Sequence, residues 1–384
     1  MRETYKRIGD YIRLVDERNK GLKVKNLLGL SISKEFIPSV ANIIGTDMEK
    51  YKIIRTDQFA CSVMQVRRDK KMPVALLQER EEAIISQAYP VFEIKDKSKL
   101  IPEYLMMWFT RSEFDREACF YAVGGVRGSL EWEDFENMKL PIPSIAKQHE
   151  IVAEYQAIEQ RIQINQKLIE KLEETAQAIY REWFVEGIDN STEKIKLNKL
   201  VQTQYGYTET ASSEVIGPKF LRITDIAQNQ IDWSNVPYCK ISNNDFEKYR
   251  LKPGDIVVAR TGATAGYGKR LHKHFPDCVF ASFLVRLIPN DIKWNLYLGL
   301  IVDSQNYRDF ILSNAEGSAQ PQANATLLSS FEIDKPDESK ILEFNIIVEP
   351  IFDLIEIYQL ENQKLSELKE LVLVKMATSK NYEL

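Results

Sequence analysis

The sequence predicts a pseudo-symmetric tandem repeat of mixed α/β (α+β) domains, each domain followed by one long helix. Three observations support this architecture: an internal repeat, the length of the chain and two extended heptad patterns. The tetrapeptide NQKL occurs at residues 165–168 and again at residues 362–365. At 384 residues, the chain is too long for a single core and long enough for two ordinary domains. Because a repeat determines the architecture, it is considered first.

Several other pairs of segments support the repeat. The pairs are YKIIRTDQFACS, anchored on Asp57, with KYRLKPGDIVVA, anchored on Asp255; IGDYI at residues 8–12 with LNKLV at residues 197–201; and GGVRGS, from Gly124, with GSAQPQ, from Gly317. Their offsets range from 189 to 198 residues, as expected for a duplication followed by small insertions and deletions in loops. The period is too long for a solenoid, so the repeated unit is one globular domain plus one helix.

The first half of the repeat is predicted to be a mixed α/β domain over residues 1–143. QFACSVMQV and AIISQAYPVFEI have the composition of strands, and PEYLMMWFTRSEFDREACF that of a helix. The domain ends at Pro141 and Pro143, which disfavour helix at this boundary. A long helix is expected over residues 144–187, with Gly187 as its C-terminal cap.

Apolar or seam-like residues of this first helix recur at alternating intervals of four and three, which is the heptad pattern of a coiled coil. They are Ile151, Tyr155, Ile158, Ile162, Asn165, Ile169, Leu172, Ala176, Ile179 and Trp183.

The second half repeats the same order of elements. A second α/β domain is predicted over residues 188–335, with DIVVAR and CVFASFLVRLI as strands and NLYLGLIVDSQNYRDFILS as helix. A second long helix is predicted over residues 336–384, beginning at Pro336. Its heptad residues are Ile351, Ile355, Tyr358, Asn362, Leu365, Val372 and Met376, and Lys369 interrupts the pattern.

Each heptad pattern contains one polar seam residue, and Asn165 and Asn362 are equivalent in the repeat. A polar seam residue costs stability but specifies register and partner. We therefore expect the two helices to pair as an antiparallel coiled coil; the alternative is that each helix packs only on its own domain. Paired helices of about 34 residues would form a rigid spacer of ~50 Å between the domains. This length exceeds one turn of B-DNA, ~34 Å.

The composition restricts the class of protein. No stretch approaches the ~20 apolar residues of a membrane span, and the first residues have no apolar segment of a signal peptide. We expect a cytoplasmic protein that contacts no membrane. The cysteines Cys61, Cys119, Cys239 and Cys278 form no CxxC pair. This spacing suits a reducing compartment and argues against disulfides or structural zinc.

The basic residues are locally concentrated, although the formal net charge is −5. A nucleic-acid-binding protein usually carries positive charge where it meets phosphates. The segment QVRRDKK of the first domain has a local charge of +3, and residues 252–275 of the second have +4. Two basic loops at equivalent places in duplicated domains indicate a bipartite nucleic-acid footprint. Ordinary solvated charged loops are the alternative.

The sequence contains no convincing catalytic or metal site. In RTGATAGYGKR, Ala263 stands where a phosphate loop needs its first glycine, and Arg270 follows Lys269 where a hydroxyl is needed. His272, His274 and Cys278 have metal-like spacing but no fourth ligand nearby, so a surface loop is expected instead of a metal site. Serine-nucleophile and amino-methyltransferase motifs are absent. We therefore expect a non-catalytic protein.

Several motifs resemble those of one known family over essentially the whole chain. They are YKRIGDYIRLVDERN, FACSVMQVRRD, AIISQAYPVFEI and KPGDIVVARTGATAGYGK, followed by the helical LPIPSIAKQHEIVAEY and NIIVEPIFDLIEIYQLENQKL. With these motifs the chain resembles the specificity (S) subunit of a type I restriction-modification system. It departs from the family before the second helix, where IDKPDESK stands in place of a hydrophobic-Pro-Pro sequence.

The resemblance implies a division of labour between subunits. Each globular domain would be a target-recognition domain that reads one half of a bipartite target in double-stranded DNA. The helices would separate these domains and dock two methyltransferase (M) subunits, while motor-nuclease (R) subunits would complete the complex. S-adenosylmethionine, Mg and ATP would bind to those partners and not to this chain. A self-sufficient nuclease and a coiled-coil scaffold with protein-binding ends are the alternatives.

The resemblance also suggests site residues. The expected DNA contacts are Arg67, Arg68, Lys70, Lys71, Arg260, Thr261, Thr264, Lys269, Arg270 and Lys273, with Arg127 as a weaker candidate. Arginine and lysine can contact guanine edges or phosphates, and threonine can contact either bases or the backbone. The expected coiled-coil and partner interface comprises Ile158, Ile162, Asn165, Ile169, Leu172, Ile179, Trp183, Ile355, Tyr358, Asn362 and Leu365.

Overall fold

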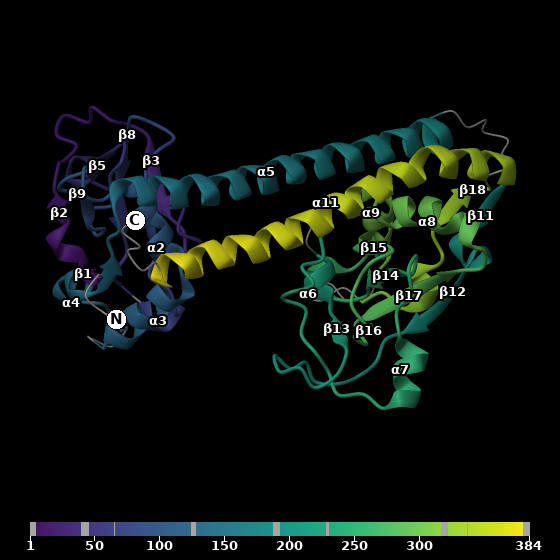
Figure 1. Ribbon diagram of the computed structural model, residues 1–384. Coiled ribbons are helices and arrows are strands. Elements are labelled where there is room, and N and C mark those ends of the chain that lie inside the picture. The colour runs from purple at the N-terminus through teal and green to yellow at the C-terminus, as the bar shows by residue number, and fades with distance from the viewer. Residues whose placement is uncertain are drawn as a thin grey trace. The chain divides into compact units, whose positions relative to one another are not determined.

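The computed structural model contains two compact units, each combining one globular domain with parts of two long helices (Figure 1). Unit 1 comprises residues 1–163 and 363–384, and unit 2 comprises residues 164–362. The structure describes residues 5–39, 46–64, 66–123, 128–186, 193–227, 230–315, 322–335 and 337–378. Within these ranges, no helix has the combined length and apolar character needed to cross a membrane.

The first domain contains two four-stranded sheets. One is antiparallel, in the order β2 (Ile12–Val15), β9 (Val91–Ile94), β6 (Phe59–Cys61) and β7 (Val74–Leu76). The other has the order β4 (Phe36–Pro38), β3 (Leu27–Leu30), β8 (Glu82–Ile85) and β5 (Lys52–Arg55), with β3 and β8 parallel. A separate pair joins β1 (Tyr5–Arg7) to β10 (Lys139–Pro141).

Short helices complete the first domain. They are η1 (Ile8–Asp10), η2 (Met48–Lys50), α1 (Val66–Asp69), α2 (Pro102–Thr110), α3 (Ser112–Tyr121) and α4 (Trp132–Asn137). The core between sheet and helices is aromatic. Phe59 stacks on Phe92 with ring centroids 5.0 Å apart, and Phe109 meets both rings edge-on. Such contacts add to the stabilisation from burying the rings.

The second domain repeats the antiparallel sheet of the first, but a two-stranded parallel pair stands in place of the other four-stranded sheet. Its four-stranded antiparallel sheet has the order β12 (Val201–Tyr205), β17 (Leu284–Pro289), β14 (Ile256–Ala259) and β15 (Gly268–Arg270). A parallel pair joins β13 (Lys219–Leu221) to β16 (Cys278–Phe280), and an antiparallel pair joins β11 (Lys194–Lys196) to β18 (Glu332–Asp334). The helices are η4 (Leu197–Lys199), α6 (Ile223–Ile226), α7 (Asn243–Tyr249), η5 (Gly262–Thr264), η6 (Ile292–Trp294), α8 (Asn295–Val302), α9 (Gln305–Asn314) and α10 (Ala325–Leu328).

The common order of the antiparallel sheets supports the predicted duplication. However, the predicted alignment of Asp57 with Asp255 is wrong by one residue. The side chain of Gln58 accepts a hydrogen bond from the Arg55 amide at 2.9 Å, and Asp255 accepts one from the Lys252 amide at 2.6 Å. Gln58, not Asp57, is therefore the counterpart of Asp255. Asp57 matches Gly254 instead, because both adopt left-handed backbone conformations, with φ of 64° and 85°. The Gly124 and Gly317 anchors lie outside the described residues.

The long helices are α5 (Ile145–Arg181), which continues as a π-helical turn over Glu182–Glu186, and α11 (Glu338–Thr378). They contact each other in both units. In unit 1, Lys375 pairs with Glu154 and Lys369 with Glu159. In unit 2, the Asn165 amide donates to Asn362 Oδ1 at 2.9 Å. Residue numbers rise along one helix as they fall along the other, so the predicted antiparallel pairing is confirmed.

The heptad pattern identified the inward face of α5. All ten of its predicted seam residues are buried or half-buried, and Asn165 and Ile169 are fully buried. Lys369 interrupts the heptad pattern of α11, and its side chain contacts two residues of α5. Its ammonium lies 5.3 Å from the ring centre of Tyr155 and 3.1 Å from a carboxylate oxygen of Glu159. These contacts stabilise the half-buried ammonium group of Lys369. The predicted helix boundaries at Gly187 and Pro336 lie outside the described residues.

Five predicted elements are shorter than expected. AIISQAYPVFEI divides into β8 and β9, and CVFASFLVRLI divides into β16 and β17. QFACSVMQV is a strand only over Phe59–Cys61. The helix expected over PEYLMMWFTRSEFDREACF divides into α2 and α3 at Arg111, which is extended and stacks its guanidinium on Trp108 at 4.4 Å. NLYLGLIVDSQNYRDFILS divides into α8 and α9, because the Ser304 hydroxyl accepts from the Tyr307 amide and starts a new helix.

Replacing Ile169 with alanine should destabilise the helix pair. Ile169 lies one turn after Asn165 and is 0% exposed, so Ile169→Ala leaves a cavity and should lower the free energy of unfolding by about 2–4 kcal/mol. Ile164 is 51% exposed on the same helix, so Ile164→Ala should change it by less than about 0.5 kcal/mol. Equilibrium denaturation of the full chain checks both values. Equal effects of the two variants would contradict the assignment of the seam.

Candidate nucleic-acid interface

The first basic segment, Arg67–Lys71, lies on the surface of the first domain around helix α1. Val66 anchors it, because its side chain is fully buried, and the Arg67 amide donates to the Gly128 carbonyl at 3.2 Å. The side chains of Arg67, Arg68, Lys70 and Lys71 are exposed. Arg68 pairs with Asp69 at 2.6 Å, and no other ion pair is formed by these four cations within the described part of the chain.

A buried ion pair lies directly below this segment. Lys34 Nζ is 2.8 Å from Asp115 Oδ1, and the same oxygen accepts a hydrogen bond from the Met72 amide. Burial lowers the pKa of Lys34, and its contact with Asp115 opposes that shift. The pair thus holds the backbone in place immediately after Lys71. The exposed cations are therefore attached to a well-ordered segment.

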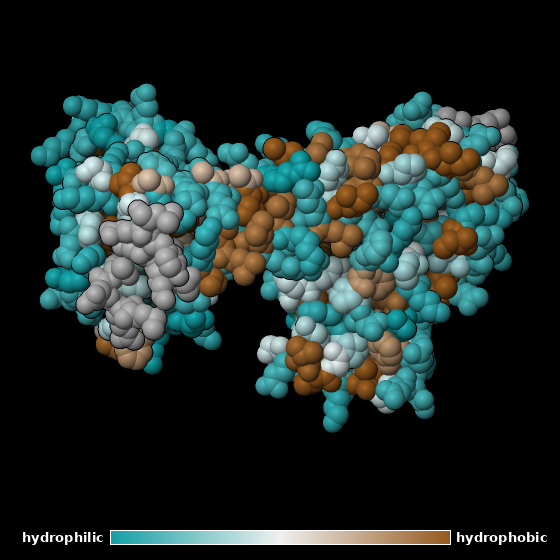
Figure 2. Space-filling view, viewed as in Figure 1, coloured by the Kyte–Doolittle hydropathy of each residue, from teal (hydrophilic) through white to brown (hydrophobic). Residues whose placement is uncertain are grey.

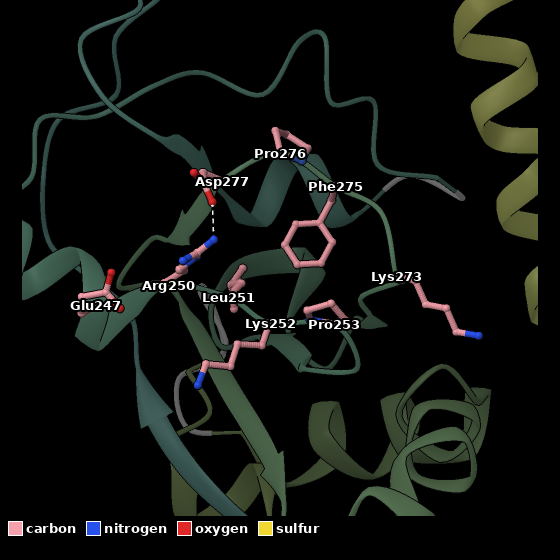
Figure 3. Close-up of a pocket in the computed structure, with 9 residues that line it drawn as sticks. All are labelled: Glu247, Arg250, Leu251, Lys252, Pro253, Lys273, Phe275, Pro276 and Asp277. Carbon is pink, nitrogen blue, oxygen red and sulfur yellow. Dashed lines mark hydrogen bonds and ion pairs between the residues drawn. The ribbon is translucent and has the colours of Figure 1, made fainter.

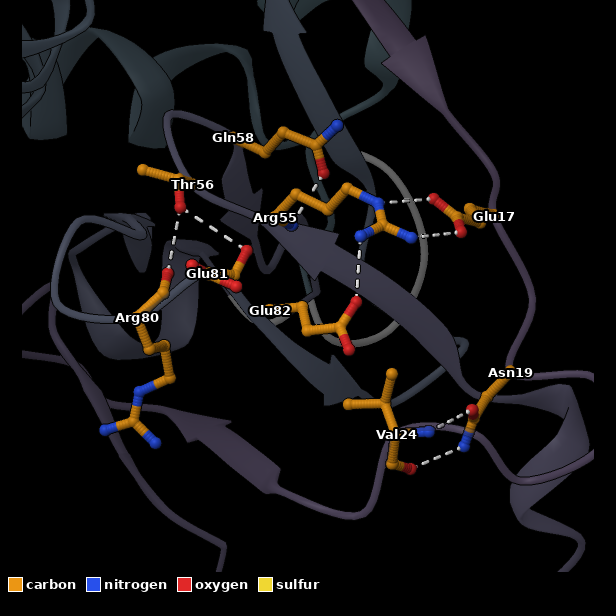
Figure 4. Close-up of polar contacts among 9 residues, drawn as sticks. All are labelled: Glu17, Asn19, Val24, Arg55, Thr56, Gln58, Arg80, Glu81 and Glu82. Atoms are coloured by element: carbon orange, nitrogen blue, oxygen red, sulfur yellow. Dashed lines mark hydrogen bonds and ion pairs between the residues drawn. The ribbon is translucent and has the colours of Figure 1, made fainter.

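Other cations of the first domain are neutralised internally. The guanidinium of Arg55 makes hydrogen bonds of 3.0 and 2.7 Å to Glu17 and one of 2.8 Å to Glu82 (Figure 4). Arg13 likewise donates to Glu93 at 2.6 Å. A cation held by carboxylates has less to gain from a phosphate than one facing only water. The cations of the first basic segment are therefore better placed to contact an anion.

The second basic segment, Arg260–Lys273, does not form one surface. β14 and β15 form a hairpin in which Ile256 lies opposite Arg270 and Val258 lies opposite Gly268. Arg260 follows the end of β14, whereas Arg270 faces its beginning. The structure therefore separates the cations that the sequence grouped together.

The cations at the Arg270 end have partners on α11 and at the C-terminal end of α8. The Arg270 guanidinium stacks on Phe352 of α11 at 4.6 Å, and Lys273 pairs with Asp353 at 2.7 Å. Lys269 lies 3.5 Å from Asp303. The predicted DNA contacts of Arg270, Lys269 and Lys273 stay predictions. Their geometry favours a structural role, in which Arg270 and Lys273 hold the second domain to α11 and Lys269 holds β15 to the end of α8.

The two histidines of this segment also face α11. His274 Nδ1 lies 2.7 Å from Glu356 Oε1, and the His272 ring lies 6.2 Å from that of Phe352. Burial, together with the charge of Arg270, lowers the pKa of His272 to about 4. Their partners are thus a carboxylate and a phenyl ring of the helix. In the part of the chain that the structure describes, no cluster of His, Cys, Asp or Glu is arranged to hold a metal.

At the other end of the hairpin, Arg260 lies beside two aromatic residues. Its guanidinium is 5.2 Å from the ring centre of Tyr205, and its amide donates to the carbonyl of Phe283. Thr261 is 8% exposed and its carbonyl accepts from the Thr264 hydroxyl, so neither threonine is freely presented to a base. Sequence reasoning missed Phe283, because only the tertiary structure brings it beside Arg260. The remaining candidate, Arg127, lies outside the described residues.

A hollow on the second domain carries further charges. It is lined by Glu247, Arg250, Leu251, Lys252, Pro253, Lys273, Phe275, Pro276 and Asp277 (Figure 3). Arg250 donates to Asp277 at 2.8 Å across this hollow, and Lys273 is held by Asp353. Two of its three cations are thus already neutralised, which makes it a weaker anion site than the first basic segment.

The helices carry an exposed apolar face that the heptad pattern did not identify. On α11 within unit 2 it includes Ile346, Leu354 and Ile357, which are 75%, 43% and 56% exposed. Hydrophobic side chains gather along the long helices in Figure 2. The available signal in the sequence was the spacing of these apolar residues outside the seam, which lie eight and then three positions apart. An exposed face of this kind is typical of a protein-protein interface.

Comparisons with known proteins agree on one family. A family model described as type I restriction modification DNA specificity domain matches residues 67–174 and 205–370, more than half of the chain. The curated specificity subunit of the type I restriction enzyme MjaVIII from Methanocaldococcus jannaschii is 24% identical over 272 residues. That match covers 64% of this chain and 63% of the relative, so it spans less than two thirds of the relative's length.

A solved structure shows the same fold. The S subunit of a type I restriction-modification system from M. genitalium matches with a TM-score of 0.58 and 12% sequence identity. The match covers 98% of this chain and 96% of that one. The tandem arrangement of α/β domains with two long helices is thus shared with a protein of very different sequence.

The contact between His272 and α11 should make the second domain sensitive to acid. The pKa of histidine is about 6.5 in an unfolded chain and about 4 for His272 in the fold. As the pH falls below 6.5, the unfolded chain therefore binds the proton first and the free energy of unfolding decreases. Between pH 7 and pH 5 the wild type should lose at most about 2 kcal/mol more than His272→Gln. Denaturation at both pH values measures this; identical losses would contradict it.

Proposed function

The chain belongs to the family of type I restriction-modification DNA specificity domains, and we propose that it is the DNA-recognition subunit of such a system. One observation carries the proposal: the family model matches each half separately, and the antiparallel sheets of both halves have the same strand order. Each domain would then contact one half of a bipartite target in double-stranded DNA. Among the residues that the structure describes, no specific contact favours a self-sufficient nuclease or a protein-binding scaffold instead.

The charges of the first domain support DNA contact by an acidic protein. Arg67, Lys70 and Lys71 are exposed on a rigid base, and the described residues provide no carboxylate partner for them. Phosphate contacts of this kind supply affinity and orientation, whereas contacts to base edges supply specificity. The net charge of −5 implies that partner subunits would supply part of the positive surface around DNA.

The helix pair would set the distance between half-sites and dock two methyltransferase subunits. The exposed apolar face of α11 in unit 2 supports this role, because covering Ile346, Leu354 and Ile357 with a partner would lower the free energy. S-adenosylmethionine would bind to the methyltransferase subunits, and ATP and Mg to the motor-nuclease subunits. The chain itself would be non-catalytic.

Mapping methylated adenines in the host genome tests this function. With the chain present, methylation should fall at a split, asymmetric sequence, and deletion of the chain should abolish it. The variant Arg67→Ala/Lys71→Ala should weaken DNA binding by the complex with methyltransferase subunits. It should also reduce the slope of log affinity against log salt by about 0.9 for each phosphate that the variant no longer neutralises.

A matched control separates local contacts from net charge. Arg13→Ala/Arg55→Ala removes two cations from the same domain, but both are held by carboxylates. This variant should leave the salt slope nearly unchanged. Equal slopes for both double variants would refute the assignment of the first basic segment, and methylation that does not depend on the chain would refute the proposed function.

The docking role predicts a separate effect on assembly. Ile357→Asp places a charge on the exposed face of α11, so it should prevent co-purification with the methyltransferase subunits while leaving thermal unfolding of the free chain unchanged. Val215→Asp is the control, because Val215 is 77% exposed in a loop of the second domain. If Ile357→Asp assembles as well as Val215→Asp does, α11 does not dock the partner through this face.

A further inference from the structure

We propose that Phe283, Arg260 and Tyr205 form the base-contacting surface of the second domain, with the Phe283 ring stacked against a base of that domain's half-site. The proposal rests on the proposed function and assigns specific residues to it. Phe283 is 55% exposed and Tyr205 is 43% exposed. A single exposed ring is ordinary on a protein surface, so the case depends on how the ring is held and on its neighbours.

The turn that carries Phe283 is rigidly held on both sides. The Leu284 amide closes it by donating to Ala281 O at 2.8 Å. On the β12 side, the Gly206 amide donates to Leu284 O and the Tyr207 amide to Phe280 O. On the β14 side, the Arg260 amide donates to Phe283 O at 3.0 Å. The ring therefore projects from a backbone whose position is determined by two neighbouring strands.

Gly206 shows how closely this turn is packed. A Cβ atom at residue 206 would lie 2.2 Å from Ala281 O, far inside a normal contact distance. Only glycine allows β12 to continue alongside the turn at this distance. The close approach keeps Tyr205, at the end of β12, near the turn.

The guanidinium of Arg260 is held in place by neighbouring residues, but no carboxylate among the described residues neutralises its charge. Its Nη1 donates to the Ser282 carbonyl at 3.5 Å, and its guanidinium lies 5.2 Å from the Tyr205 ring centre. The Tyr205 hydroxyl accepts from the Ala325 amide, which fixes that ring in turn. Arg260 forms no ion pair with any residue that the structure describes. This contrasts with Arg250, Lys269 and Lys273 of the same domain, each of which has a carboxylate partner.

An exposed aromatic ring beside an available arginine suits a nucleic acid. Apolar rings insert at base steps or stack on bases, and this contact does not depend on ionic strength as a phosphate contact does. Arginine beside the ring can reach a phosphate or the O6 and N7 edge of guanine. The two side chains together would thus contact both the base and the charge of one nucleotide step.

The first domain lacks this pair at the equivalent place. Its corresponding turn is closed by the Tyr89 amide donating to Ser86 O, and Ala88 occupies the position of Phe283. Val63 occupies the position of Arg260, since its carbonyl accepts from the Leu130 amide as that of Arg260 accepts from Ala323. The two domains have therefore diverged at this surface, and the inferred contact concerns only the half-site of the second domain.

The test uses the complex of the full chain with its methyltransferase subunits. Target DNA carries 2-aminopurine at successive positions of each half-site, and its fluorescence reports stacking. Wild-type complex should change the emission at one position of one half-site, and Phe283→Ala should abolish that change. The variant should also lower the affinity for DNA about ten-fold, with an unchanged slope of log affinity against log salt. It should relax the sequence preference of methylation at that half-site alone. Val215→Ala, another exposed apolar residue of the domain, should behave as wild type.

The outcomes separate this inference from the proposed function. A Phe283→Ala complex with wild-type affinity, emission and half-site preference would overturn the role of Phe283. Equal relaxation of both half-sites would also overturn it, because the contact is assigned to one domain. If the wild-type complex itself prefers no DNA sequence, the proposed function fails together with the inference. Thermal unfolding of the free chain should be nearly the same for Phe283→Ala and wild type, because the ring is 55% exposed.

Discussion

The hydrogen bond between Asn165 and Asn362 joins two residues that occupy the same place in the two copies of the repeat. Asn165 is fully buried in the seam of α5. A shift of one helix by a turn would place its amide against apolar side chains and leave a buried donor unsatisfied, at about 1–3 kcal/mol. The pair thus specifies the register of α5 and α11. Register decides which residues of α11 face the second domain and which remain in water for a partner.

The second domain depends on that register through its contacts with α11. Arg270 stacks on Phe352, Lys273 pairs with Asp353 and the His274 ring meets Glu356. All three partners lie on α11 within two turns, so a slipped helix would break these contacts together. Arg270 and Lys273, which the sequence predicts to contact DNA, thus also have partners on the helix. Arg260, at the opposite end of the β14–β15 hairpin, forms no ion pair with any residue that the structure describes.

Local sequence patterns predicted the helices and the duplication well, because both depend on short-range periodicity. The seam of α5, including Asn165 and Ile169, followed from heptad spacing alone. The single-residue error between Asp57 and Gln58 arose because both repeats contain an aspartate at the turn, whereas backbone conformation and hydrogen bonding determine the true match. Phe283 could not be predicted, since its neighbours Tyr205 and Arg260 are far from it in sequence.

By itself, the sequence determined the family, the tandem architecture and the pairing of the helices, because apolar periodicity and repeated motifs are properties of the chain in order. Only the tertiary structure decided the role of each charge. Arg55 and Arg67 belong to the same domain, yet one is held by Glu17 and Glu82 while the other is exposed. Whether a cation is available to DNA depends on which carboxylates the fold brings within a few ångströms of it, and that distance is not encoded in any local pattern.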